Sequence, residues 1–310
     1  MTLAIIPVLW YIPRRLFERV EPWYKEVNVD QITTGAHTSP LFHADNKQYF
    51  DIARLENTAR EVVAASSLIQ RCRRGDRAAA IALSRGFEPF TRDFQEAIDL
   101  RIKALKWKTV LGKVGRETLK SKLSASKNAL RQLADSEMEA IFGSATECLK
   151  SMQLDEFSHW RVWRHDANNL GITDDEMDNE PILPTVQKLI EMTRTKDPVM
   201  FFAGALGSTE FMAEELGRVL SNEPRYYSLF RPVGRKDRGH AFWMEVHIAN
   251  HPGVSHEDIV LDFARLFVED STQTREEIEE AAVHGLRLFG SAADEVEEHF
   301  CPRSSMIAAE

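Results

Sequence analysis

The sequence predicts an all-α protein, and three observations lead to that fold class. Glycine and proline are both scarce, at 15 and 12 of 310 residues. Strand-like runs of Val, Ile and Thr are nearly absent, whereas apolar residues recur every three or four positions over long stretches. A hydrophobic content of 43% is enough to bury a substantial core. We therefore expect a helical bundle rather than a β-sandwich or an alternating β/α fold.

The predicted organisation is one catalytic domain with an N-terminal extension. Residues 1–46 are expected to form an arm and loop that pack on the core, residues 47–300 a single helical bundle, and residues 301–310 a flexible tail. The apolar run near the start is much shorter than the roughly 20 residues that span a bilayer. It also lacks the basic start and small-residue end of a signal peptide. We expect no membrane segment.

Apolar periodicity and turn signals give the expected order of helices along the domain. The first half should contain helices at about 47–73 and 77–110, an interrupted helix at 114–152, and a helix that runs to about 168 and ends at Gly171. An acidic linker, 174–184, should follow. The second half should contain helices at about 185–195, 198–221, 237–251, 255–269 and 274–300, with an irregular link at 221–236.

Charge and cysteine content narrow the classes of function. The net charge is −9, which argues against nucleic-acid binding. The stretch from Arg101 to Lys127 is basic and the stretch from Glu257 to Glu298 is acidic, and we interpret both as solvated helical faces. Cys72, Cys148 and Cys301 are far apart and form no CxxC pair. A reduced, cytoplasmic protein is therefore expected.

The segment D155-E-F-S-H-W-R-V-W-R-H165 contains the most informative pair of residues. Glu156 and His159 lie one helical turn apart on the same face. That face also carries apolar residues, so the pair should point inward or into a cleft. A buried, ionised Glu is costly without a partner, and a metal ion would supply one. A surface ion pair is the alternative reading of the same spacing.

Two later segments offer further ligand types. Glu210 follows the small-residue run of F201-F-A-G-A-L-G-S-T-E210, which lets a ligand or another helix approach the backbone closely. His240 and His247 share a helical face, and Glu245 lies beside that face. A π-bulge would rotate Glu245 inward. His256 and His284 are surrounded by acidic residues and are expected to be solvated.

The order of these motifs resembles the heme-oxygenase-like diiron oxidases. A Glu-x-x-His pair is followed about fifty residues later by a lone Glu and then by a His-x6-His helix. The resemblance covers roughly residues 50–300 and implies a heme-oxygenase-like helical bundle. It implies two Fe(II)/Fe(III) ions bound by Glu156, His159, Glu210, His240, Glu245 and His247. Met244 occupies the position where the family usually has an acid, and Glu56 and Glu96 are candidates for a further carboxylate ligand.

The implied activity is O2-dependent oxidation of a small amino-acid-like or fatty-acid-like metabolite, such as carbon–carbon cleavage, N-oxygenation, desaturation or ring formation. A role in specialised metabolism would fit. Trp160, Trp163, Phe211 and Trp243 could line the pocket, with Arg161 or Arg164 as partners of a substrate carboxylate. The sequence is compatible with the use of an external electron donor and with a homodimer.

Two alternatives remain beside the diiron hypothesis. One is a metal-independent, thiaminase-like hydrolase on the same fold, which would need a pocket cysteine such as Cys148 or Cys72. The other is a helical interaction protein without metal, with the basic 101–127 stretch as its docking surface. No Gly-rich phosphate loop, G-x-S-x-G elbow or dinucleotide-binding fingerprint is present.

Overall fold

The computed structural model describes residues 50–104, 152, 153, 156, 159–231, 241–248, 256–265 and 272–301. Within these ranges every regular element is a helix, so the predicted all-α class is confirmed. Several features discussed above lie outside the described residues: the arm 1–46, most of the basic stretch 101–127, the expected helix at 114–152 up to its last residue, His240, Cys148, and the tail beyond Cys301.

The first three described helices are α4 (Ile52–Ala65), α5 (Ser67–Arg73) and α6 (Arg77–Ala104). The expected helix at 47–73 is divided in two at Ser66, whose backbone is extended and whose hydroxyl accepts a hydrogen bond from the Ile69 amide. Ser66 therefore ends α4 and caps the start of α5. Gly75 adopts a φ of +80° in the turn before α6, a conformation that suits glycine.

Residues 159–169 form the helix that carries His159, and Gly171 follows it at a φ of +88°, as the sequence predicted. The expected acidic linker instead contains the short helix α10 (Asp174–Asp178). A capping box between Thr173 and Glu176 stabilises its start, which is a local signal that the acidic composition obscured. Helix α11 (Pro184–Thr193) begins with proline in its first turn.

The expected helix at 198–221 is a π-helix, η3 (Met200–Gly207), continued by α12 (Ser208–Leu220). The short helices α13 (Pro224–Tyr227) and α14 (Phe242–Val246) follow. Helix α15 (His256–Arg265) precedes the long closing helix α16 (Thr272–Phe300). The predicted apolar stripe of α16 is confirmed, since its members are buried: Ile278, Ala281, Gly285, Phe289, Ala292 and Val296.

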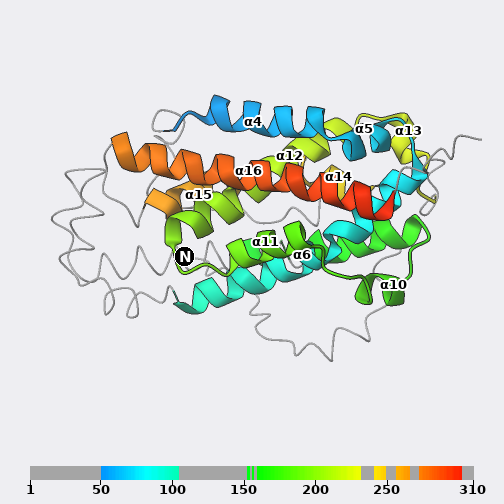
Figure 1. Ribbon diagram of the computed structural model, residues 1–310, viewed down its shortest axis with the longest axis horizontal. Coiled ribbons are helices and arrows are strands. Elements are labelled where there is room, and N and C mark those ends of the chain that lie inside the picture. Colours follow the sequence, from blue (N-terminus) through cyan, green and yellow to red (C-terminus); the bar gives the residue numbers. More distant parts are fainter. Residues whose placement is uncertain are drawn as a thin grey trace, which may run out of the picture.

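Helix α16 is the central element of the bundle (Figure 1). It packs against η3, α4, α6, α11, α12 and α5, and α4 runs beside it along the long axis of the molecule. The crossing with η3 and α12 is very close: a Cβ atom at Gly285 would lie 1.9 Å from the Gly204 carbonyl oxygen and 2.3 Å from the Ser208 hydroxyl. Only glycine can occupy position 285 in this arrangement.

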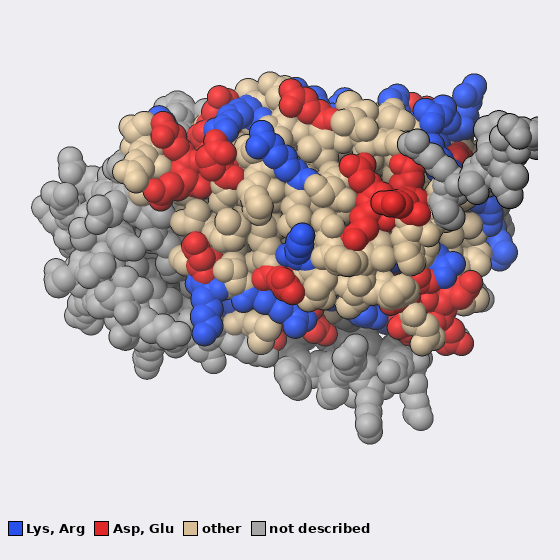
Figure 2. Space-filling view, in the orientation of Figure 1, with Lys and Arg blue, Asp and Glu red and all other residues tan. Residues whose placement is uncertain are grey.

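The outer surface is mixed in charge. On the face in Figure 2, acidic and basic side chains are interspersed with neutral ones. Among the described helices, none combines the length and the apolar character that a bilayer crossing requires.

Candidate metal centre

The helix at 159–169 and the residues just before it place Glu156 and His159 inside the bundle. Both side chains are buried, together with Met152, Val162 and Trp163 from the same face. The His159 Nδ1 atom lies 3.1 Å from Glu156 Oε1. The spacing of three residues therefore produces a buried pair rather than a surface ion pair.

Glu210 enters the same space from the first turn of α12, directly after the π-helix. It is buried, and its Oε1 atom has no hydrogen-bond partner among the described residues. Burial raises the pKa of Glu210, the nearby imidazole of His256 opposes that rise, and the Glu156 carboxylate adds to it. A carboxylate in this setting requires a positive partner to remain ionised.

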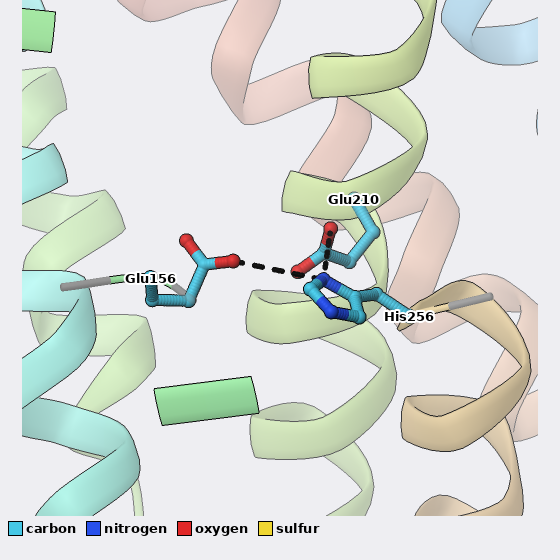
Figure 3. A group of neighbouring side chains, drawn as sticks. All are labelled: Glu156, Glu210 and His256. Carbon is cyan, nitrogen blue, oxygen red and sulfur yellow. Dashed lines mark ion pairs between the residues drawn. The ribbon is translucent and has the colours of Figure 1, made fainter. Parts of the chain in front are cut away.

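His256, at the start of α15, supplies part of that partnership. Its Nδ1 atom lies 3.4 Å from Glu210 Oε2 and 3.7 Å from Glu156 Oε1 (Figure 3). Glu156, Glu210 and His256 each offer a ligand atom, and these atoms lie within 4.8 Å of one another. The expectation that His256 is solvated was therefore wrong, because α15 packs against η3 and α12 and buries the imidazole. His284 is exposed, as expected.

His247 adds a third imidazole from the end of α14. Its ring centroid lies 4.5 Å from that of His159 and 4.0 Å from that of Trp243. The His247 Nδ1 atom is 2.7 Å from the Trp243 carbonyl oxygen, which can only accept a hydrogen bond. The Nδ1 atom therefore donates this hydrogen bond, which in a neutral imidazole leaves Nε2 as the atom that can bind a metal ion.

Glu245 is not brought into this cluster. Its amide donates to the Ala241 carbonyl, 3.2 Å away, which is the spacing of an ordinary α-helix. The π-bulge that would rotate Glu245 inward is absent from α14, and a π-helix lies instead before Glu210. Glu56 and Glu96 are exposed on α4 and α6, so the structure does not bring either of them to the cluster.

Glu156, His159, Glu210 and His247 form one wall of a pocket that is partly open to solvent. Trp160, Trp163 and Trp243 line it, whereas Phe211 is buried on α12 without lining it. Among the described residues, no lysine or arginine lines the pocket.

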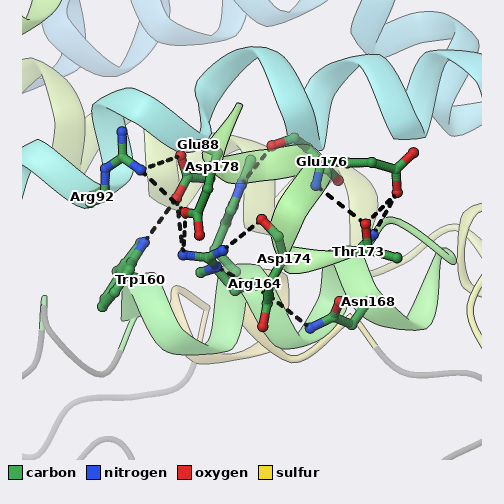
Figure 4. A network of polar contacts seen from close by, with 11 residues as sticks. Glu88, Arg92, Trp160, Arg164, Asn168, Thr173, Asp174, Glu176 and Asp178 are labelled. Carbon is green, nitrogen blue, oxygen red and sulfur yellow. Dashed lines mark hydrogen bonds and ion pairs between the residues drawn. The ribbon is translucent and has the colours of Figure 1, made fainter. Parts of the chain in front are cut away.

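Arg164 does not line the pocket and instead pairs with acidic residues of α10, as Figure 4 shows. Its guanidinium group pairs with Asp174 at 3.3 Å and with Asp178 at 3.0 Å on α10. Beside it lies Glu88 of α6, a fully buried carboxylate that the sequence reading did not single out. Glu88 accepts a hydrogen bond from Trp160 Nε1, 3.3 Å away, and burial raises its pKa against the opposing charges of Arg92 and Arg164. These contacts hold Trp160 in the pocket wall.

The residues present fit a metal ion. Two buried carboxylates face each other with an unpaired oxygen, and three imidazoles adjoin them without any lysine or arginine in the lining. Carboxylate and imidazole donors of this kind suit iron and similar divalent metals. The described cysteines do not line the pocket. Burial raises the pKa of the Cys72 thiol, so this residue is not a ready thiolate.

This chain is similar to a known protein in its fold, but not in its sequence family. No protein-family model matches this sequence, and no curated protein does either. Among solved structures, a TenA homolog from Pseudomonas syringae pv. tomato is similar at a TM-score of 0.57 and 13% identity. The match covers 85% of this chain and 97% of that one. Together with the helix order above, this similarity shows that the chain has a helical, heme-oxygenase-like fold.

Proposed function

We propose that this protein is a non-heme iron oxidase that uses O2 to oxidise a small molecule bound in the pocket. The observation that carries the proposal is the buried cluster of Glu156, Glu210 and His256, with His159 and His247 beside it. Two facing carboxylates without a basic side chain in the pocket lining are an unfavourable arrangement unless a cation neutralises them. The resemblance of the motif order to diiron oxidases supports iron as that cation.

Five side chains would hold the metal: Glu156, His159, Glu210, His247 and His256. His256 is an additional donor outside the family pattern, and this chain has Met244 where the family usually has an acid. Bound iron would supply the capacity to activate O2.

The surrounding residues have supporting roles. Trp163 and Trp243 are buried and pack edge to face, with centroids 4.9 Å apart, and they exclude water from one side of the cluster. Glu156 orients His159 through its Nδ1 atom, and the Trp243 carbonyl orients His247. These contacts fix both imidazoles before any ligand binds.

The experiment is anaerobic loading with Fe(II), followed by exposure to O2 in the presence of candidate substrates. Iron-dependent O2 consumption by the wild type, with a loss of at least about 100-fold in His159→Ala and Glu210→Gln, is the expected result. Cys148→Ser is the matched control and should retain full activity. Equal O2 consumption by the wild type and His159→Ala would rule out the proposal.

The similarity to a TenA homolog favours a second candidate, a thiaminase-like hydrolase. That chemistry would need a nucleophilic cysteine in the pocket. Cys148, outside the described residues, is the cysteine to test. Hydrolysis of pyrimidine substrates without iron, abolished in Cys148→Ser and retained in His159→Ala, would establish this candidate in place of the first.

A further inference from the structure

A second pocket lies on the surface between α5 and α13, and most of the side chains that line it are charged or polar. We call it the arginine pocket, and its lining consists of Gln70, Arg73, Arg74, Glu223, Pro224 and Arg225. Its volume of about 440 Å³ is within the range of small-molecule sites. In Figure 2, basic side chains gather at the upper right, where Figure 1 shows α5 and α13. The pocket is therefore a candidate site for an anion.

One side of the arginine pocket is fixed by hydrogen bonds around Arg73. The Nε and Nη2 atoms of Arg73 donate to Glu223 Oε1, at 3.2 and 2.8 Å, and Nη1 donates to Gln70 Oε1 at 3.2 Å. Gln70 Nε2 in turn donates to the Val63 carbonyl at 3.0 Å. The one carboxylate of the lining is thus already paired, and Arg73 keeps two of its five N–H groups for a ligand.

The other two arginines have no such partner. Arg74 and Arg225 are exposed, and neither forms an ion pair within the ranges that the structure describes. The turn after α5 lies against α13: a Cβ atom at Gly75 would be 3.0 Å from the Arg225 carbonyl oxygen and 3.2 Å from Arg225 Cβ. The negative C-terminal end of α5 accounts for Arg73 in its last turn, but it does not account for Arg225, which belongs to α13.

The charge of the pocket suits a dianion. Its lining holds three arginines and one glutamate, a net charge of +2, in a chain whose overall charge is −9. The positive surface continues to Arg77 and Arg231, whose Nη2 atoms would lie 3.4 and 3.8 Å from a Cβ atom at Gly171. A phosphate monoester carries a charge of about −1.5 to −2 at pH 7, and its oxygens accept the paired N–H groups of arginine. A monocarboxylate supplies only half of the charge that the lining can neutralise.

We infer that the arginine pocket binds the phosphate group of a small molecule. Arg74 and Arg225 are its principal donors, and Arg73 is a third donor that is already held in position. The bound phosphate joins α5 to α13, two segments about 150 residues apart in the chain. The arginine pocket shares no lining residue with the pocket that contains the Glu and His cluster, so this inference does not depend on the proposed function.

The test is isothermal titration calorimetry of the full-length protein with inorganic phosphate, glycerol 3-phosphate and acetate, and with glycerol as the uncharged control. Both phosphates should bind at least about 10-fold more tightly than acetate, and their binding should weaken as NaCl is added. Equal affinity for the two phosphates would identify free phosphate as a sufficient ligand. Tighter binding of glycerol 3-phosphate would show that the organic part contributes. Either result supports the site.

Substitutions in the lining should change the phosphate affinity in opposite directions. Arg74→Gln and Arg225→Gln should each weaken phosphate binding about 10-fold, because each removes a charged donor. Glu223→Gln removes the one carboxylate of the lining and should tighten phosphate binding about 3-fold. Arg60→Gln, at an exposed arginine of α4 that pairs with Glu56, is the control and should leave the affinity unchanged. A variant that merely unfolds cannot tighten binding.

Equal effects of Arg225→Gln and Arg60→Gln would overturn the inference, and so would equal affinities for acetate and phosphate. The titrations are repeated with metal-free and Fe(II)-loaded protein, because phosphate bound to iron would be lost with the metal, whereas phosphate in the arginine pocket should remain. Phosphate binding that requires iron would therefore contradict the inference while supporting the iron site. Binding of an acidic protein without any binding of phosphate would show a docking surface in its place.

Discussion

Glu210 is the residue whose environment depends most on a bound cation. It is buried near Glu156 with one oxygen unpaired, and among the described residues the imidazoles of His256 and His159 lie beside the two carboxylates. Such a residue would lower the stability of the metal-free protein and raise the affinity for the metal ion that we propose. At this position, a gain in metal affinity would therefore come with a loss of stability in the metal-free protein.

Substitution of Glu210 should separate these two effects. Glu210→Gln should raise the unfolding free energy of the metal-free protein by about 1–2 kcal/mol, because it removes one of two facing buried charges. The same variant should lose the increase in melting temperature that Fe(II) gives the wild type. Denaturant and thermal unfolding, each with and without metal, measure both.

Glu215 provides the matched control on the same helix. It is equally buried but paired with Arg218. Glu215→Gln should lower stability by about 1 kcal/mol and leave the response to metal intact. If both variants behave alike, the special position of Glu210 is contradicted.

The pKa of Glu214, a second acid on α12, predicts that the stability of the protein depends on pH. Partial burial, and then the neighbouring charge of Glu257, raise the pKa of Glu214 to about 7. The unfolded chain releases this proton at a lower pH than the folded chain does. Stability should therefore be fully present below the unfolded pKa and fall as the pH rises toward and through about 7.

Glu214→Gln should remove that part of the pH dependence. The measurement is the denaturant midpoint of wild type and variant between about pH 5 and pH 8, where the wild type should lose more stability than the variant. Glu298→Gln, at an exposed position on α16, controls for the loss of one surface charge. A wild-type and a Glu214→Gln profile that run parallel would refute the assignment.

At the scale of elements, the crossing of α16 with η3 determines where Glu210 lies. Gly285→Ala should cost about 3 kcal/mol, because its new methyl group would overlap the Gly204 carbonyl unless a helix moves. Metal affinity should fall as well, since η3 leads directly into the turn that carries Glu210. Thermal unfolding and metal titration test both effects.

Gly290 is the control on the same helix. A Cβ atom there would lie 3.1 Å from Val62 Cγ1, which a small side-chain movement relieves. Gly290→Ala should therefore be neutral or stabilise the protein by up to about 1 kcal/mol. A Gly285→Ala protein as stable as Gly290→Ala would show that the crossing is not tight.

Helix α14 is held in place by a buried acid on the helix that carries His159. Asp166 Oδ2 accepts a hydrogen bond from the Trp243 amide at 2.8 Å, and α14 ends at His247. Asp166→Ala should cost about 1–3 kcal/mol, because the buried amide loses its partner. Metal affinity should fall about 10-fold through the displaced His247, while Asp174→Ala on the surface should leave it unchanged. Unaltered metal binding in Asp166→Ala would contradict this role.

The sequence predicted which segments are helical better than it predicted where a helix breaks or changes type. Apolar periodicity identified α16 and the α4–α5 region, because long amphipathic stripes survive in any tertiary context. It missed the π-helix, since all seven residues from Phe201 to Gly207 are buried and leave no polar face to define a period. It also missed the break at Ser66, where a hydroxyl caps the next helix instead of continuing the first.

The candidate site was predictable only where its residues are neighbours in sequence. Glu156 and His159 share a turn, so their spacing indicated a pair. His256 joins them through the packing of α15 against η3 and α12, which no local pattern encodes. Conversely, Glu245 lies next to the expected ligand position in sequence, but an ordinary α-helical turn keeps it out of the cluster.

At the scale of the whole molecule, the fold brings candidate metal ligands from separate helices to one end of an apolar pocket inside a bundle. The segment around His159, α12, α14 and α15 each supply one or two donors, while α4, α6 and α16 supply the apolar walls. We propose that these donors together bind iron. The iron content of the protein can be measured without knowledge of the substrate.

The most direct measurement is the iron content of the full-length protein after anaerobic reconstitution with Fe(II) and removal of excess metal. We expect at least about one iron ion per chain for the wild type, and a clear loss in Glu210→Gln and His256→Ala. Glu215→Gln should retain the wild-type content. Iron well below about one ion per chain, or the same iron content in all four proteins, would contradict the account.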